Sequence, residues 1–107
     1  MTNEIKAVVV DPSTGPRLTT IDGSLKTLQE LVGGLIEGVF GPDYTMYVDE
    51  EGHLNGLEYN PEASAFARRE LGAAYLVGTA VILGPGDSEG NDTSVHPNTL
   101  TYYNLEN

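Results

Sequence analysis

The period of the hydrophobic pattern changes several times along the chain, and each change marks a predicted element. Residues 5–11 (IKAVVVD) are a run that begins with alternation and ends fully apolar. Residues 12–16 (PSTGP) favour a turn, and residues 17–21 (RLTTI) form a second short extended run. Two such runs joined by a turn are typical of a β-hairpin, which we expect at the start of the chain.

The helical period begins directly after this hairpin. Apolar residues recur there at three- and four-residue spacing, at Leu25, Leu28, Leu31, Val32 and Leu35. This spacing predicts an amphipathic helix with Asp22 or Ser24 as its N-cap. The glycines at residues 33–34 supply the permissive backbone that commonly ends a helix. Residues 36–40 can then run as a strand, and residues 41–43 (GPD) favour a turn.

Strict alternation returns at residues 44–49 (YTMYVD), which predicts a strand with two different faces. One face receives Tyr44, Met46 and Val48, and the more polar face receives Thr45, Tyr47 and Asp49. Residues 53–59 also have an extended pattern. We therefore expect two strands joined by the short segment between them.

That segment holds three consecutive carboxylates followed by a glycine, Asp49-Glu50-Glu51-Gly52. A type I turn favours Asp at its first position and Gly at its fourth, so the segment is predicted to be a turn. Gly52 is expected in the left-handed conformation of a three-residue hairpin loop. Glu50 and Glu51 are then solvated corners, which a partner could recognise.

The clearest local signal is Asn60-Pro61-Glu62, which predicts the start of a second helix. Asn is a preferred N-cap, Pro suits the first helical position, and Glu favours the positive end of the helix dipole. Gly72 is expected to close this helix. Its apolar stripe consists of Ala63, Phe66, Ala67 and Leu71.

The end of the chain alternates between very apolar and very polar segments. Residues 73–84 (AAYLVGTAVILG) predict a central buried strand, in which Gly78 marks a bulge or a close backbone approach. Residues 84–100 are a long polar loop, and residues 101–105 (TYYNL) are expected to be a final edge strand. An edge of this kind could pair between chains, which would give a homo-oligomer. Residues 1–107 thus predict a single small α+β domain, a mainly antiparallel sheet with two helices.

The amino-acid composition says little about the fold, but it limits the kinds of partner that the protein can bind. Sixteen acidic residues face five basic ones among 107, a formal net charge of -11. Direct binding to nucleic acid is not expected, because phosphate contacts need clustered Lys and Arg. Two interpretations of the charge stay open: it keeps the protein soluble, or it mimics nucleic acid in the basic groove of a DNA-binding partner.

Targeting and disulfide signals are not found in the sequence. Cysteine is absent, and no apolar stretch approaches the roughly 20 residues that span a bilayer. The first residues (MTNEIKAVVVDP) do not have the pattern of a signal peptide. We expect a cytoplasmic protein without a membrane partner, in the host cytoplasm if a phage encodes it.

No motif in the chain selects a cofactor, a metal or a reaction. His53 and His96 stand alone, whereas a zinc site needs three or four converging ligands. Residues 87–92 (DSEGND) half-resemble a calcium loop, but the glycine is misplaced and no Glu closes the loop. We therefore expect no metal, no cofactor and no catalytic residues, and an enzyme is the least favoured interpretation.

Two groups of residues are candidates for binding. The first is the acidic turn with its neighbouring tyrosine: Tyr47, Asp49, Glu50 and Glu51. The second is the pair Arg68 and Arg69, which with a tyrosine could bind the phosphate and the base of a nucleotide. The competing explanation for the arginines is structural, because cations suit the negative end of a helix.

Three segments in this order and spacing resemble a known family: GSLKTLQELVGGLIEGV, YVDEEGHLNGLEYNPEASAF and YLVGTAVILG. The family is domain of unknown function 3846, found in actinobacteria, other bacteria, and their phages and plasmids. The resemblance spans residues 5–84, and it supplies no catalytic residues. It implies an accessory protein that acts on the host.

Together, these features favour a non-catalytic acidic binding protein. Our leading hypothesis is a phage or mobile-element factor of counter-defence type that binds and inhibits a host protein, such as a DNA-binding or defence protein. A second hypothesis is a small-molecule sponge that sequesters an anionic nucleotide signal. An enzyme of unknown reaction is the third.

Overall fold

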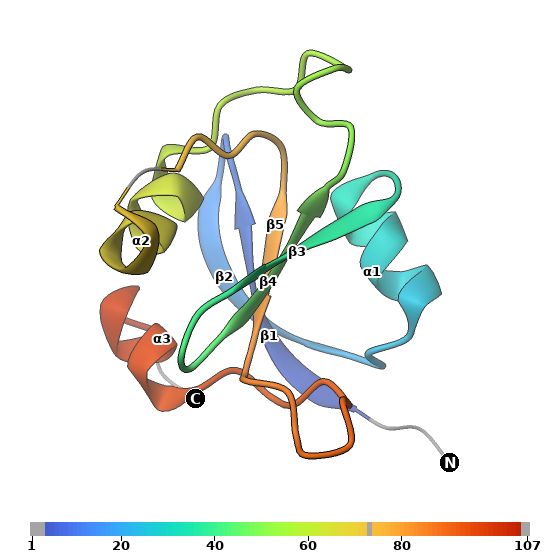
Figure 1. Cartoon of the computed structure of the whole chain (residues 1–107), viewed down its shortest axis with the longest axis vertical. Helices are drawn as coiled ribbons and strands as arrows, with labels where there is room; N and C mark the ends of the chain where they lie inside the picture. The colour runs from blue at the N-terminus through green and yellow to red at the C-terminus, as the bar shows by residue number, and fades with distance from the viewer. Residues whose placement is uncertain (1–3, 73, 106–107) are drawn as a thin grey trace.

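The computed structural model describes residues 4–72 and 74–105, and a five-stranded sheet in the order β2-β1-β5-β4-β3 forms its centre (Figure 1). The strands are β1 (Ile5–Asp11), β2 (Gly15–Ile21), β3 (Ile36–Phe40), β4 (Thr45–Asp49) and β5 (Ala80–Leu83). The helices are α1 (Leu25–Val32), α2 (Pro61–Leu71) and α3 (Pro97–Tyr102). The expected α+β fold is confirmed, with a third, short helix in addition to the two that were predicted.

All neighbouring strands of the sheet pair in antiparallel orientation. The predicted hairpin of β1 and β2 is confirmed, with the register running from Ile5↔Ile21 to Asp11↔Gly15. Strand β5 lies between β1 and β4, and all four of its residues are buried. Strands β2 and β3 therefore form the two outer edges of the sheet.

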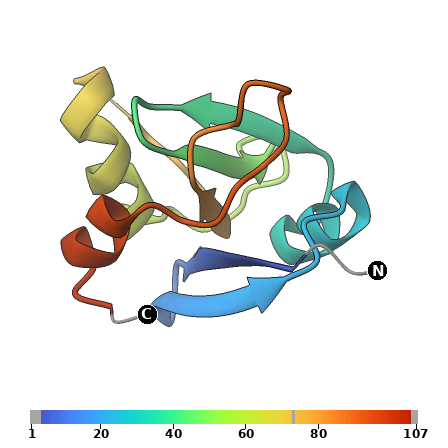
Figure 2. The same cartoon turned by 90° about the horizontal axis from the view of Figure 1, so that it is seen from below.

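The two faces of the sheet carry different helices (Figure 2). On one face, which we name the α1 face, Leu28 and Val32 of α1 pack with Val9 of β1 and Val81 of β5. The opposite face, the α2 face, is covered by α2 and α3. Because successive residues of a strand point to opposite faces, every central strand contributes to both cores.

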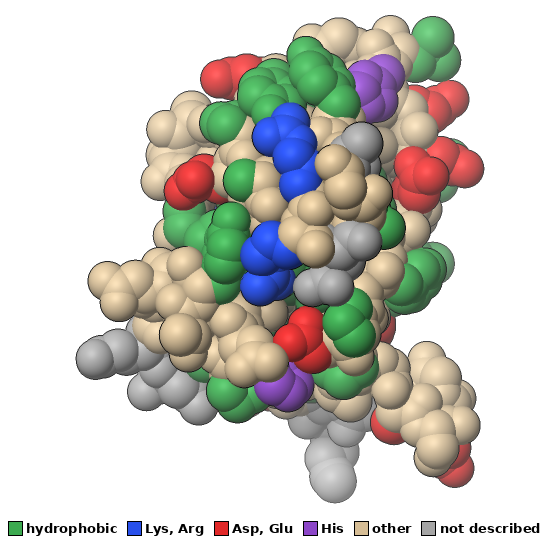
Figure 3. All heavy atoms as spheres, turned by 60° about the vertical axis from the view of Figure 1, so that its left-hand side comes forward, with side chains coloured by type: hydrophobic (Ala, Val, Ile, Leu, Met, Phe, Trp, Pro, Cys, Tyr) green, Lys and Arg blue, Asp and Glu red, His purple; other side chains and the backbone are tan. Residues whose placement is uncertain are grey.

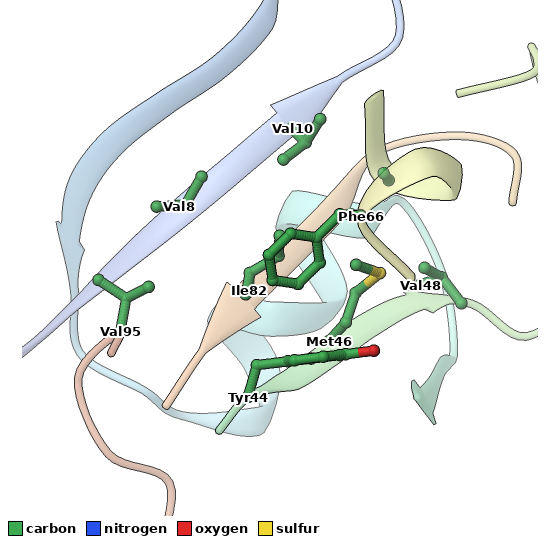
Figure 4. Packing of buried hydrophobic residues seen from close by; sticks show 10 residues of the cluster. Val8, Val10, Tyr44, Met46, Val48, Phe66, Ile82 and Val95 are labelled. Atoms are coloured by element: carbon green, nitrogen blue, oxygen red, sulfur yellow. The ribbon is translucent and has the colours of Figure 1, made fainter. Parts of the chain in front are cut away.

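The core on the α2 face is built around Phe66 of α2 (Figure 4). Its ring lies 4.7 Å from the ring of Tyr44, measured between centroids. Met46 and Ile82 extend from the sheet into the same cluster. The predicted alternation of residues 44–49 is thus confirmed, since Tyr44, Met46 and Val48 share this face.

Both predicted helix starts are confirmed by the capping geometry. The Ser24 hydroxyl accepts a hydrogen bond from the Thr27 N–H at 3.1 Å, and the Asn60 side chain accepts one from the Ala63 N–H at 3.0 Å. Gly33 ends α1 in the left-handed conformation, with φ of 89°. The prediction for Leu71 was wrong: it is 52% exposed in the last turn of α2.

The strand expected at residues 53–59 is wrong. The chain instead continues through turns after β4, and only Tyr59 makes an isolated bridge, to Val77. The reason is topological: β3 and β5 already occupy both edges of β4, so a further hairpin partner has no free edge. Gly52 is not left-handed either, whereas Gly56 is, with φ of 68°.

The strand expected at residues 101–105 is also wrong, because α3 covers its start and turns follow; α3 also replaces the end of the loop predicted at residues 84–100. His96 caps this helix by accepting the Asn98 N–H on its ring Nδ1 at 3.0 Å, and Pro97 is pre-organised for the first helical position. Leu100 of this helix and Tyr103, directly after it, pack against the core of the α2 face. The edge proposed for pairing between chains is therefore absent from residues 101–105.

The long apolar segment forms a shorter strand than expected. Only residues 80–83 are extended within the sheet, and Ala73 lies outside the described residues. Gly78 lies before the strand with φ of 75°, and a Cβ on it would lie 2.7 Å from the Leu57 side chain at Cδ1, so it is neither a bulge in the strand nor a close backbone approach. Among the described residues, no helix combines the length and apolar character needed to cross a membrane.

Candidate functional site

The acidic turn, residues 49–52, follows directly from β4 and is held by two hydrogen bonds. The Gly52 N–H donates to the carbonyl of Asp49 at 3.1 Å, as a β-turn requires. The Asp49 carboxylate accepts the N–H of Glu51 on Oδ1 at 2.8 Å, a bond that Asp commonly makes two residues ahead in turns. The predicted turn is thus confirmed, and Asp49 fixes its shape.

This role removes Asp49 from the exposed candidates. Only 8% of its surface is accessible, and one carboxylate oxygen already accepts a main-chain N–H. Glu50 and Glu51 are exposed as expected. The turn therefore presents two carboxylates to solvent, and the third works as its internal brace.

Tyr47, the tyrosine proposed as a binding residue beside the acidic turn, does not lie at the exposed corner of the turn. It is half-buried and packs against the core of the α1 face. Its hydroxyl donates to Asp92 Oδ1 at 2.8 Å, so it ties β4 to the polar loop before α3. Burial, together with this hydrogen bond to a carboxylate, raises the pKa of Tyr47 to about 12. Tyr47 is therefore a structural residue of the loop attachment.

A third exposed carboxylate lies beside the turn, on the edge strand β3. Glu37 is paired with Val48, whose side chain belongs to the α2 face, so Glu37 projects from that face too. Glu50 continues the pairing two residues after Val48, because its N–H donates to the Leu35 carbonyl at 2.8 Å. Glu37 on β3 and Glu50, the first residue after β4, consequently lie near the same corner of the sheet. We name Glu37, Glu50 and Glu51 the acidic edge.

Exposed apolar side chains frame this edge. Leu35, the residue before β3, is 56% exposed, and Phe40, the last residue of β3, is 67% exposed. The Phe40 ring folds back along its own strand, since a Cβ on Gly38 would lie 2.6 Å from the end of that ring. The acidic edge thus lies beside accessible apolar surface.

Sequence reasoning missed Glu37, Leu35 and Phe40 because nothing local marks β3 as an outer strand. The available signal was indirect. Strand β2 carries Pro16 and Arg17, which are residues that natural edge strands use against further pairing, whereas β3 carries neither Pro nor a basic residue.

The second candidate group lies on α2, on the opposite face of the sheet from Tyr47. The Arg68 guanidinium donates from Nη2 to the Tyr59 hydroxyl at 2.8 Å and from Nε to the Ala74 carbonyl at 3.1 Å. Tyr59 stacks on Tyr75 with 4.6 Å between ring centroids. The structure thus brings Arg68 to a tyrosine pair, as the nucleotide hypothesis required.

Arg69 faces a separate aromatic group. Its guanidinium carbon lies 4.2 Å from the Phe66 ring centroid and 4.5 Å from that of Tyr102, distances typical of cation–π contacts. Its Nε donates to the Phe66 carbonyl at 3.2 Å. Figure 3 views this side of the molecule, where basic side chains lie among hydrophobic ones. Arg69 therefore joins α2 to α3.

The remaining polar candidates have structural partners. His53 Nε2 lies 2.9 Å from the Tyr75 carbonyl, and the Asp87 carboxylate folds inward to accept the N–H groups of Glu89 and Asn91, each at 2.9 Å. These N–H groups lower the pKa of Asp87. Within residues 4–72 and 74–105, no three His, Asp or Glu side chains are grouped so that they could hold a metal ion.

Comparison with known proteins defines the family of the chain. No curated protein and no solved structure gives a significant match. The sequence model of one family matches residues 5–105, which includes every strand and helix described above as well as the acidic edge. The match confirms the resemblance seen in the sequence, and the chain belongs to the family described as Domain of unknown function (DUF3846).

Proposed function

We propose that this protein is a non-catalytic acidic binding protein that engages another protein through the acidic edge. The observation that carries the proposal is the placement of three exposed carboxylates at one corner of the sheet: Glu37 lies on the outer strand β3, and Glu50 and Glu51 lie in the turn after β4. A cluster of one sign of charge steers an oppositely charged partner and fixes its register.

The position of the basic residues supports this proposal. Arg68 and Arg69 are engaged by tyrosine hydroxyl, carbonyl and ring groups around α2, so they do not neutralise the acidic edge. The formal net charge of -11 gives the whole molecule a field of the same sign. The partner is therefore expected to present a basic surface.

The proposed setting is a host cell. The resemblance to a family found in phages and plasmids supports an accessory factor of counter-defence type, which binds and inhibits a basic host protein. A DNA-binding or defence protein fits this description, because its groove for nucleic acid is lined by Lys and Arg. The acidic edge then acts as a decoy for phosphate.

Capture of host proteins at stepped ionic strength tests the proposal. Tagged wild-type protein is compared with the triple variant Glu37→Gln, Glu50→Gln, Glu51→Gln. A control variant, Glu4→Gln, Glu62→Gln, Glu89→Gln, loses the same charge at exposed sites outside the acidic edge. We expect a basic host protein to bind wild type and control, to elute with salt, and not to bind the edge variant. Equal capture by all three proteins overturns the proposal.

A second candidate function is a sponge for an anionic nucleotide. The observation that favours it is the contact of Arg68 with Tyr59, whose ring is stacked on Tyr75. A guanidinium can bind phosphate while a tyrosine ring stacks on a base. Melting temperatures across a nucleotide panel test this function: a ligand must stabilise wild type and not Arg68→Gln. An unshifted melting temperature across the panel counts against it.

A further inference from the structure

We propose that β3 is a docking edge, at which an extended basic segment of the partner protein adds in antiparallel orientation as a sixth strand of the sheet. This inference rests on the proposed function, because it specifies how the acidic edge binds its partner. The expected partner segment alternates apolar residues with Lys or Arg.

The main chain of β3 offers hydrogen bonds on its outer side. The N–H of Glu50 donates to the carbonyl of Leu35, and the N–H of Gly41 donates to the carbonyl of Tyr44, so both pairs are hydrogen-bonded pairs of the β3–β4 ladder. Hydrogen-bonded and non-bonded pairs alternate along an antiparallel ladder. Between these two ends, the main-chain N–H and C=O groups of Ile36, Gly38 and Phe40 therefore point away from β4.

These outward groups lie on a terminal strand of the sheet, where no further strand from the described residues covers them. An exposed row of N–H and C=O groups is a template for pairing, and natural sheets usually block it. On the other outer strand, Pro16 lacks the N–H that a new strand would need. Strand β3 has no such block, so the two edges are not equivalent.

The side chains of β3 specify which strand fits. Ile36 and Phe40 project from the α1 face, because they are paired with Asp49 and Thr45, whereas Glu37 projects from the α2 face. A partner strand therefore meets apolar side chains on one face and a carboxylate on the other. Alternating apolar and basic residues satisfy both faces at once.

A second copy of this chain fits the edge poorly. Each copy has a formal charge of -11, and pairing two β3 strands would bring two acidic edges together. Like charges on neighbouring strands destabilise their pairing. Charge complementarity thus selects a basic segment over self-association.

Synthetic peptides test the docking edge directly. The probe is a capped peptide of about seven residues, a usual strand length, that alternates Lys and Val. In the proposed arrangement the Val residues lie on the α1 face opposite Ile36, Gly38 and Phe40, and they exchange main-chain hydrogen bonds with them. N-methylation of the Val residues should weaken binding by at least about tenfold, because main-chain bonds supply the affinity in strand addition. N-methylation of the Lys residues should have little effect.

Three further measurements complete the test. Saturation with the unmodified peptide should slow amide hydrogen exchange at Ile36, Gly38 and Phe40. Gly38→Pro removes an outward N–H that the β3–β4 ladder does not use, and it should lose peptide binding. Any Cβ at this position also displaces the Phe40 ring, so Gly38→Ala, which keeps the N–H, is the matched control and should retain binding. A peptide that alternates Glu and Val should not bind. Equal binding of the two N-methylated peptides, or exchange protection away from β3, overturns the inference.

Failure of this inference is distinguishable from failure of the proposed function. If the host protein is captured by Gly38→Pro but not by the acidic-edge variant, the acidic binder stands and strand addition falls. If the acidic-edge variant captures the same proteins as wild type, the proposed function itself falls.

Discussion

The carboxylate of Asp49 lies directly against the backbone of Gly34, so that a Cβ added to Gly34 would sit 2.9 Å from Asp49 Oδ2. Asp49 cannot easily move aside, because it is buried and its Oδ1 holds the Glu51 N–H. We expect Gly34→Ala to lower the free energy of unfolding by about 1–3 kcal/mol, the usual cost of overpacking. Chemical denaturation measures this change.

The control for this substitution is Gly86→Ala, where the nearest atom to the added Cβ is 3.7 Å away, an ordinary contact. Gly86 lies in the exposed loop before α3, so the Gly86→Ala variant should have a free energy of unfolding close to that of wild type. Equal stability of both variants would show that Asp49 does not pack against Gly34 in solution.

Asn60 is predicted to be the most sensitive polar residue. Its buried side chain donates to the carbonyls of Val10 at 2.9 Å and Gly78 at 2.8 Å, and it also accepts the N–H of Ala63. Asn60→Ala leaves these groups without their partner, and we expect a loss of about 2–4 kcal/mol, since a lost cap and an unsatisfied buried group each cost about 1–2 kcal/mol.

Thermal and urea unfolding measure the Asn60 effect. Asn55→Ala is the matched control, because Asn55 is exposed in the turn before α2. A loss for Asn60→Ala no larger than that for Asn55→Ala would contradict the proposed bracing of β1, α2 and the segment before β5.

Arg69→Gln is predicted to loosen α3 without unfolding the sheet. The substitution removes the cation from the rings of Phe66 and Tyr102, an interaction worth about 0.5–1 kcal/mol at exposed sites. Amide hydrogen exchange should become faster in α3 and stay unchanged in β5. Arg68→Gln is the comparison, because its contacts join α2 to Tyr59 and Ala74, so α3 should keep its protection.

Because of Tyr47, we expect the free energy of unfolding to fall at high pH. Its pKa is raised from 10.0 to about 12 in the folded protein, so the unfolded chain releases this proton first. The contribution of Tyr47 to the free energy of unfolding should be constant below pH 10 and should fall as the pH rises toward about 12. Tyr47→Phe should make this fall smaller, as measured by urea unfolding across the alkaline range.

Tyr103 contributes in the same direction, because burial also raises its pKa. The informative comparison is therefore between Tyr47→Phe and wild type in how steeply the free energy of unfolding falls with rising pH. Tyr103→Phe is a second reference. An unchanged alkaline slope in Tyr47→Phe would mean that Tyr47 is neither buried nor bonded to Asp92 in solution.

The candidate site was only partly predictable from the sequence. The turn at residues 49–52 and the exposure of Glu50 and Glu51 followed from residue preferences within four positions. The inward orientation of Tyr47 did not, because its hydroxyl partner Asp92 is far away in the chain. Glu37 became a candidate only when β3 proved to be an outer strand.

The sequence by itself determined the local features: α1 with its Ser24 cap, α2 with its Asn60 cap, and the first hairpin. These depend on hydrogen bonds and side-chain spacing between residues near one another in the chain. Only the tertiary structure decided that residues 53–59 are not a strand and that β3 is an edge. A strand has two edges, and which segments take them depends on pairings between distant residues, such as β1 with β5, that local preference does not encode.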